Sequence, residues 1–171
     1  MSTRSTLAAM FATLALSLAA AAATPAGGPV TVEYVDPQGF TDIREGFRRP
    51  RVDGNPHLNA LRKHFEKRVP RYLAAGQTLH IRVTDVDLAG DHRAQTNPWL
   101  LDVRLVTNVY PPGISLNYTL KDPAGAVLRT GDARLRDLGF DIGSGGPVAD
   151  PYRYEKRMLD KWLYREFGGK R

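Results

Sequence analysis

Four polar side chains that lie close together in the sequence are the residues best suited to chemistry. Asp85 and Asp87 share one face of an expected strand end, and Asp91 and His92 follow in the loop. Carboxylate oxygens are preferred ligands of hard cations such as calcium, and a histidine beside them could act as a base. The cluster gives one hypothesis, a small cation-dependent or acid/base hydrolase.

The spacing of these acids matches a known calcium loop poorly. An EF-hand would need an oxygen ligand where Ala89 stands and a bidentate glutamate near Thr96, and both are missing. Aspartates after a strand also commonly accept hydrogen bonds from backbone amides of the turn. We therefore expect Asp85 and Asp87 to shape that turn, and we expect neither a bound metal nor a cofactor.

The other reactive groups form no catalytic motif. His57 and His64 are two helical turns apart, and the chain has no cysteine and no His-Glu-x-x-His pattern. The glycine-rich segment 143–146 lacks the Lys-Ser/Thr ending of a phosphate-binding loop and the strand-to-helix elbow of a hydrolase nucleophile. These absences favour a non-enzymatic protein, although catalytic partners can be distant in sequence.

Basic residues gather in two places. The first group is in an early loop: Arg44, Arg48, Arg49 and Arg51. The second is on the exposed side of an expected helix: Arg62, Lys63, Lys67, Arg68 and Arg71. Such a surface could bind lipid headgroups or envelope polysaccharide, but exposed helices commonly carry basic side chains that bind nothing. The excess of 24 Lys and Arg over 18 Asp and Glu is mild.

The first part of the chain predicts a strand and a helix that would position these groups. Alternating apolar residues predict a strand over 30–34. Asn55 followed by Pro56 is a typical helix start, and apolar residues then recur at helical spacing as far as Gly76. Pro70 should kink this helix because proline lacks a backbone donor.

The second part predicts four strands and a helix. The strands are expected over 78–88, 99–107, 114–121 and 127–135, and Gly131 in the last strand indicates a bulge. The helix should start after Asp150 and Pro151 and end at Gly168. The order strand, helix, four strands, helix predicts an α+β two-layer sandwich, with a mostly antiparallel sheet of about five strands and two main helices on one face.

The first 23 residues predict an export signal. Arg4 is the only charge, and an apolar run covers 7–20. Three alanines at 21–23 supply the small residues that a signal peptidase needs at its cleavage site. The apolar run of about 14 residues is shorter than the roughly 20 that span a bilayer. We therefore expect a signal peptide at 1–23 and one domain over 24–171, in a periplasmic or secreted protein that starts near Thr24. Without cysteine it should not be a lipoprotein.

Four stretches resemble one protein family. They are GQTLHIRVTDVDLAG at 76–90, YPP at 110–112, LRDLG at 135–139 and YEK at 154–156. Together they are similar to the exported bacterial proteins known as the domain of unknown function 3016 family. The resemblance implies export and marks the DVDLAG segment as a family hallmark. It carries no assigned activity and so transfers no catalytic residue.

Two functional hypotheses remain. The first is a non-enzymatic envelope module that binds an envelope protein or an anionic envelope component through its sheet face or edge. It would not span the membrane after signal cleavage, and export argues against nucleic acid as a partner. The second is the hydrolase that uses the acids at 85, 87 and 91. A concave pocket joining His92 to those acids would favour the enzyme, and a flat exposed sheet would favour binding.

Overall fold

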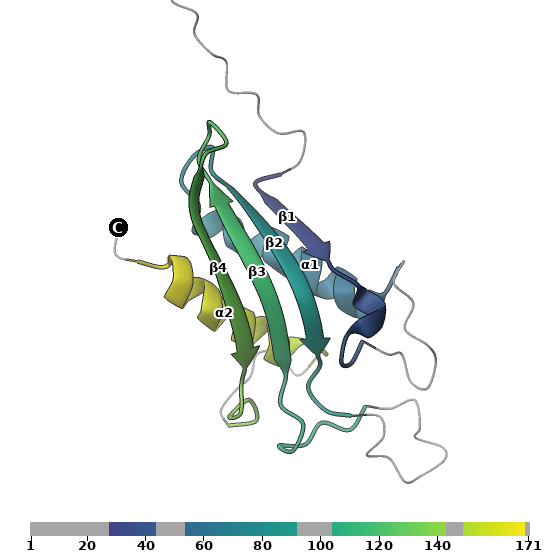
Figure 1. Cartoon of the computed structure of the whole chain (residues 1–171). Helices are drawn as coiled ribbons and strands as arrows, with labels where there is room; N and C mark the ends of the chain where they lie inside the picture. The colour runs from purple at the N-terminus through teal and green to yellow at the C-terminus, as the bar shows by residue number, and fades with distance from the viewer. Residues whose placement is uncertain (1–27, 44–53, 92–103, 143–148, 170–171) are drawn as a thin grey trace, which may run out of the picture.

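The computed structural model describes residues 28–43, 54–91, 104–142 and 149–169, which form an α+β fold (Figure 1). In chain order the elements are β1 (Val30–Tyr34), the 3-10 turn η1 (Pro37–Gly39), α1 (Pro56–Arg68), the 3-10 turn η2 (Val69–Arg71), β2 (Thr78–Asp87), β3 (Gly113–Lys121), β4 (Val127–Arg136) and α2 (Arg153–Phe167). The predictions that concern 1–27, 44–53, 92–103 and 143–148 lie outside the described residues.

The four strands form one mixed sheet in the order β1-β2-β3-β4. β1 runs parallel to β2, whereas β2, β3 and β4 pair antiparallel. The parallel pair follows from α1, because a helix between two strands allows the second strand to return in the same direction as the first. The predicted sheet of about five mostly antiparallel strands is therefore corrected to four mixed strands.

The strand expected over 99–107 is absent from the described residues 104–107. Leu105 instead makes an isolated antiparallel bridge with Asp91, which stands in the same connection. The backbone hydrogen bonds run from Asp91 N to Leu105 O at 3.0 Å and from Leu105 N to Asp91 O at 3.2 Å. The connection between β2 and β3 thus pairs with itself at this bridge, and its described residues add no strand to the sheet.

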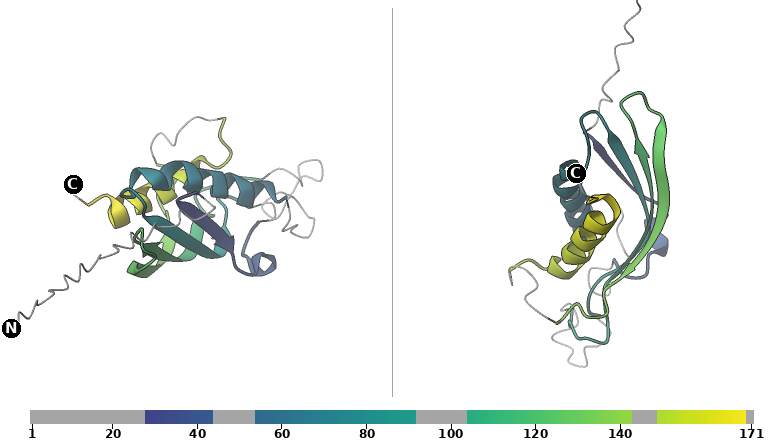
Figure 2. Two further views of the ribbon diagram at one scale, coloured as in Figure 1. Left: turned by 90° about the horizontal axis from the view of Figure 1, so that it is seen from above. Right: turned by 90° about the vertical axis from the view of Figure 1, so that its left-hand side faces the viewer.

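Both helices cover one face of the curved sheet (Figure 2). Their apolar faces pack on the inward residues of β2 and β3, and the buried core includes Phe65 of α1 and Trp162 of α2, whose rings meet edge to face with centroids 6.4 Å apart. The opposite face of the sheet carries polar residues that are neighbours across the strands, such as Arg82, Asn117 and Asp132. The two-layer arrangement is therefore as predicted from the amphipathic pattern.

The strand pairing has two irregularities, and the one in β4 is not at Gly131, where it was predicted. The register of β2 and β3 shifts between Val83 and Asp85, so that Val83 and Val86 are both buried. Gly131 pairs regularly with Tyr118, and the shift in β4 lies nearer its start. A Cβ on Gly131 would lie 2.7 Å from Tyr118 Oη. Glycine at this position therefore makes room for the Tyr118 ring and does not mark a bulge.

Polar side chains bind backbone amides at or just before the starts of both helices. Asn55 Oδ1, at the N-cap of α1, accepts hydrogen bonds from the backbone amides of His57 and Leu58, at 3.0 and 3.1 Å. Asp150 Oδ1 accepts one from the amide of Tyr152 at 3.0 Å, in the turn that precedes α2. α1 ends at Arg68, where Pro70 forces a 3-10 turn, and does not continue to Gly76 as predicted.

Candidate functional site

The acids predicted as a cluster have separate partners in the structure. Asp85 accepts hydrogen bonds from both the backbone amide and the hydroxyl of Thr41, at 2.7 and 2.9 Å. Asp87 lies 3.8 Å from Arg136 Nη1 on the open face of the sheet. Burial raises the pKa of Asp87, and the Arg136 guanidinium acts in the opposite direction. Asp85 accepts a backbone amide, as expected, but from the segment after η1 and not from its own turn.

Asp91 is buried beside the isolated bridge to Leu105, and His92 lies outside the described residues. Among the residues that the structure describes, no group of three or more His, Asp or Glu side chains is arranged to hold a metal ion. In the described part of the chain the three acids therefore do not meet at one site. The hydrolase hypothesis stays a prediction.

The hallmark segment DVDLAG, which ends β2 and continues to Gly90, is tied to the core by a buried carboxylate. Glu155 of α2 is 1% exposed, and its Oε1 accepts a hydrogen bond from the backbone amide of Ala89 at 2.8 Å. Gly90 has a φ of +85°, and a Cβ there would lie 2.5 Å from the carbonyl oxygen of Leu105. Arg104 donates to the Gly90 carbonyl at 2.9 Å and to Asp42 at 2.7 Å. The segment has a structural role that explains its residue types.

The predicted basic surface divides into two parts. Arg48, Arg49 and Arg51 lie outside the described residues. On α1, Arg62 turns toward the sheet and donates to the carbonyl of Val32 at 2.8 Å. The other basic residues of α1 line the side that faces α2. Only this second part can be described as a site.

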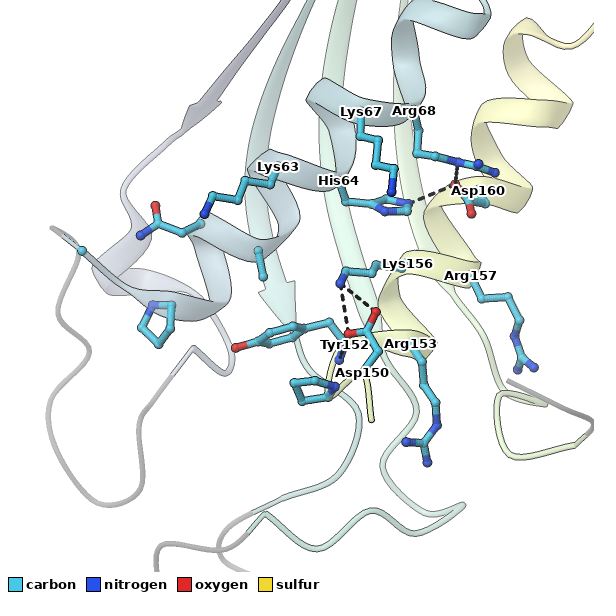
Figure 3. Close-up of a pocket in the computed structure, with 15 residues that line it drawn as sticks. Lys63, His64, Lys67, Arg68, Asp150, Tyr152, Arg153, Lys156, Arg157 and Asp160 are labelled. Atoms are coloured by element: carbon cyan, nitrogen blue, oxygen red, sulfur yellow. Dashed lines mark hydrogen bonds and ion pairs between the residues drawn. The ribbon is translucent and has the colours of Figure 1, made fainter. Parts of the chain in front are cut away.

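A polar groove of about 940 Å³ lies between α1 and α2 (Figure 3). Its labelled side chains are Lys63, His64, Lys67 and Arg68 from α1, and Asp150, Tyr152, Arg153, Lys156, Arg157 and Asp160 from α2 and the residues before it. Six of these ten are lysine or arginine and two are carboxylates. The groove therefore has an excess of positive charge.

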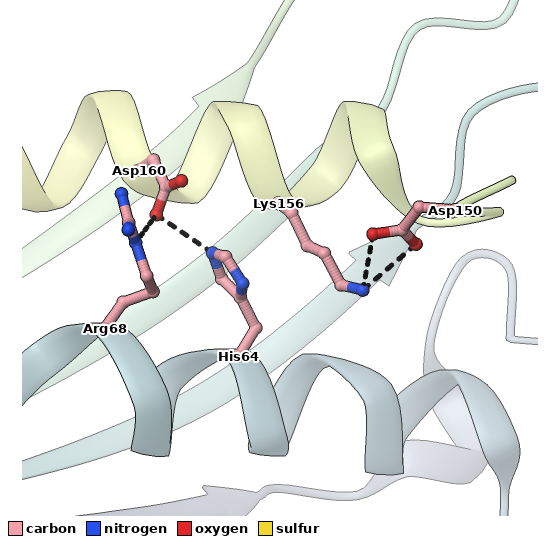
Figure 4. Close-up of polar contacts among 5 residues, drawn as sticks. All are labelled: His64, Arg68, Asp150, Lys156 and Asp160. Carbon is pink, nitrogen blue, oxygen red and sulfur yellow. Dashed lines mark hydrogen bonds and ion pairs between the residues drawn. The ribbon is translucent and has the colours of Figure 1, made fainter. Parts of the chain in front are cut away.

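Both carboxylates of the groove are neutralised within the protein (Figure 4). Asp160 Oδ1 accepts from His64 Nε2 at 3.0 Å and from Arg68 Nε at 2.8 Å. Asp150 accepts from Lys156 Nζ at 3.0 and 2.8 Å. Burial would raise the pKa of Asp150, but the hydrogen bonds from Lys156 and a backbone amide outweigh it, and the pKa is lowered. The two acids are unavailable to cancel further positive charge.

His64 is held as a neutral side chain that donates to Asp160. Burial lowers the pKa of His64, and this effect outweighs the opposite influence of the Asp160 carboxylate. An ionised carboxylate only accepts hydrogen bonds, so Nε2 carries the proton. The described residues that line the groove include no serine, threonine or cysteine. The ion pairs and the surplus of lysine and arginine are suited to charge recognition.

Lys63 and Lys67 differ from the other cations of the groove. Both are exposed, and within the described part of the chain neither makes a hydrogen bond or an ion pair. They occupy successive turns of α1, four residues apart, on the wall that faces α2. Two neighbouring ammonium groups that lack an acidic partner create a positive potential, which attracts an anion.

The α2 side of the groove was missed by the sequence analysis. Its polar residues follow the spacing of one helix face: Arg153, Lys156, Arg157 and Asp160. This i, i+3, i+4, i+7 pattern was present in the sequence, but only the apolar face of the helix was used. His64 was set aside because it is two helical turns from His57, and its acidic partner Asp160 stands 96 residues away in the chain.

Comparison with known proteins places the chain in a family. The family described as "Protein of unknown function (DUF3016)" matches residues 28–165. The chain belongs to this family. The match confirms the resemblance carried by the DVDLAG segment, and it assigns neither an activity nor a location to the DUF3016 domain. None of the curated proteins and none of the solved structures matches the chain.

None of the described helices of this DUF3016 domain is long and apolar enough to cross a bilayer.

Proposed function

We propose that this DUF3016 protein is an exported, non-enzymatic binding module whose groove between α1 and α2 holds an anionic polysaccharide of the cell envelope. The observation that carries the proposal is the pair of exposed ammonium groups of Lys63 and Lys67, unpartnered among the described residues, in a groove whose two carboxylates are already neutralised. An anion that enters the groove meets uncompensated positive charge.

The internal ion pairs support this function by fixing the walls of the groove. Asp160 joins α1 to α2 through His64 and Arg68, and Asp150 holds Lys156 at the start of α2. Groups held in place before binding lose less conformational freedom when the ligand arrives. A polar, preorganised groove suits a chain of charged sugars.

The polar lining favours a polysaccharide over a lipid surface. None of the large hydrophobic residues that are exposed in the described chain lines this groove. Proteins that lie on a membrane usually insert an apolar face beneath the headgroups. The described lining lacks such a face. The proposed location rests on the leader at 1–23, because export would bring the domain into contact with envelope saccharides.

Binding can be tested by titration calorimetry of the purified protein with an oligosaccharide of uronic acids. The double variant Lys63→Glu and Lys67→Glu should bind at least tenfold more weakly than the wild type, and wild-type affinity should fall as salt is raised. Lys121→Glu alters an exposed lysine on β3, outside the groove, and should bind normally.

Two results would contradict the proposal. Equal loss of binding in Lys121→Glu and in the groove variant would show a non-specific effect of net charge. Binding to vesicles of phosphatidylglycerol, without binding to the oligosaccharide, would assign the groove to lipid headgroups.

A further inference from the structure

β4 is an edge strand with one unpaired side. The sheet order ends at β4, which pairs with β3 along its length, and no other described strand lies beyond it. Long open edges present unpaired N–H and C=O groups that can pair with another strand. An edge of ten residues is therefore available for strand addition.

The residues whose backbone groups point outward can be identified from the pairing. Asp137 N donates to Pro112 O on the β3 side, and in an antiparallel pair alternate residues turn their backbone groups to the same side. The odd-numbered residues of β4 therefore direct their backbone N–H and C=O groups toward β3. Thr130, Asp132 and Arg134 therefore direct their N–H and C=O groups to the open edge.

α2 forms a groove along this edge. A hollow of about 440 Å³ lies between β4 and α2, and its lining is Arg134, Leu135, Arg136, Asp137, Met158, Lys161, Tyr164 and Arg165. Figure 1 shows α2 passing behind β4 and continuing beyond the open side of the strand. An added strand would pair with β4 and also lie against α2.

The groove along β4 is positively charged. Arg134 and Arg165 are exposed and make no ion pair with any described residue. Lys161 lies 3.0 Å from Asp137, the one acid in the lining, and Arg136 lies 3.8 Å from Asp87. Of the side chains that would flank an added strand, Arg134 lies on the open face of the sheet and Arg165 on the α2 side, and opposite charges across strands are stabilising. The acid beside Arg134 on the open face, Asp132, accepts a hydrogen bond from Asn117 Nδ2.

We infer that β4 accepts an extended acidic segment of a partner protein as a fifth strand. The backbone of the segment would pair with Thr130, Asp132 and Arg134, and its carboxylates would meet the guanidinium groups of Arg134 and Arg165. This is β-strand addition, in which main-chain hydrogen bonds give affinity and alternate side chains give specificity. A second copy of this chain fits less well, because like charges across a sheet edge are destabilising.

The inference is tested with two synthetic peptides, one that repeats Val-Val-Glu-Glu and one that repeats Val-Val-Lys-Lys, so that charged side chains reach both faces of the sheet. Backbone amide exchange is followed by NMR on the labelled protein. With the glutamate peptide, exchange at Thr130, Asp132 and Arg134 should slow at least tenfold, whereas odd-numbered amides of β4 are protected with or without peptide. The lysine peptide should leave the exchange unchanged.

Two variants separate the charge contribution from the backbone contribution. Arg134→Glu combined with Arg165→Glu should weaken binding of the glutamate peptide at least tenfold, while Arg71→Glu, on an exposed site outside this groove, should not. Thr130→Pro removes one outward N–H, which edge strands tolerate, and should weaken binding while the protein remains folded.

Three outcomes would overturn the inference. The first is no change in β4 amides at millimolar glutamate peptide. The second is a response confined to Lys63 and Lys67, which would place the peptide in the groove between α1 and α2. The third is self-association through β4 without peptide, seen by analytical ultracentrifugation and abolished by Thr130→Pro.

Discussion

His64 Nε2 and Asp160 Oδ1 lie 3.0 Å apart and join the two helices across the groove. The bond connects residues far apart in the chain, and Arg68 donates to the same oxygen at 2.8 Å. Loss of the Asp160 side chain would leave the largely buried His64 ring without this partner, which is costly. This contact therefore connects the shape of the groove to the stability of the fold.

The first prediction concerns the pH dependence that His64 introduces. Its pKa is lowered in the folded protein from 6.5, so below about pH 6.5 the unfolded chain binds more protons than the folded chain. The free energy of unfolding therefore decreases as the pH falls from about 6.5 toward the pKa of His64 in the folded protein. Between pH 7.5 and 5.5 the melting temperature of the wild type should therefore fall more than that of His64→Gln. Parallel melting curves would contradict the prediction.

The second prediction concerns the buried carboxyl of Glu155. Burial raises its pKa, so this group's contribution to stability falls as pH rises from the unfolded value toward the folded one. Glu155→Gln keeps an acceptor for the Ala89 amide and removes the charge, so its free energy of unfolding should equal or exceed the wild type at pH 8. Glu155→Ala leaves that amide unpaired and should lose about 1–3 kcal/mol. Urea denaturation at pH 5 and pH 8 measures both effects.

The third prediction concerns Trp162, which is 3% exposed and meets Phe65, Tyr118 and Phe167 edge to face. Trp162→Ala should reduce the free energy of unfolding by roughly 3–5 kcal/mol. Tyr164→Ala on the same helix is the matched control, because Tyr164 is 68% exposed, and its effect should stay within about 0.5 kcal/mol. An equally small effect at Trp162 would mean that α2 does not complete the core.

The fourth prediction concerns cation binding by the acids of β2. Because Asp85 is bonded to Thr41, Asp85→Ala should lose about 1 kcal/mol and Asp85→Asn less. Calcium should leave the melting temperature of the wild type unchanged, since only a ligand that binds the folded state raises it. A rise of several degrees that is lost in Asp87→Asn would revive the cation-dependent hydrolase.

The fifth prediction concerns export. Mass spectrometry of the protein recovered from the periplasm should find Thr24, or a residue within a few positions of it, at the N-terminus. An intact Met1 on the mature protein would contradict it. Replacing Leu14 and Leu16 with arginine should leave an uncleaved protein inside the cell, because a signal peptide needs an uninterrupted apolar segment.

The start of a helix could be predicted where local residue chemistry alone determines it. Asn55 and Pro56 place the start of α1 as predicted. Its end was predicted wrongly, because α1 stops at Arg68 and the 3-10 turn η2 stands where the helix was expected to continue to Gly76 beyond a kink at Pro70. The parallel pairing of β1 and β2 could also have been derived, because a helix separates them. The strand predicted over 99–107 is absent from the described residues 104–107, where Leu105 pairs with Asp91 instead, and the apolar pattern alone could not show that partner.

The candidate site was less predictable because its contacts join distant parts of the chain. Periodicity identifies the face of a helix but not the helix that packs beside it. Neither His64 nor Asp160 has sequence neighbours that indicate their pairing. Glu155 is buried, although nothing in the sequence around it distinguishes it from an exposed polar residue. Gly131 suggested a bulge because the sequence cannot show the ring of Tyr118 beside it.

The place of α2 after the sheet in the chain has a consequence for folding during synthesis. Met158, Leu159, Trp162 and Leu163 complete the core, yet they are made after every described strand. Until they emerge, much of the apolar face of the sheet has no cover, and a domain that lacks part of its core rarely folds stably. The described fold can therefore close only after α2 has been synthesised.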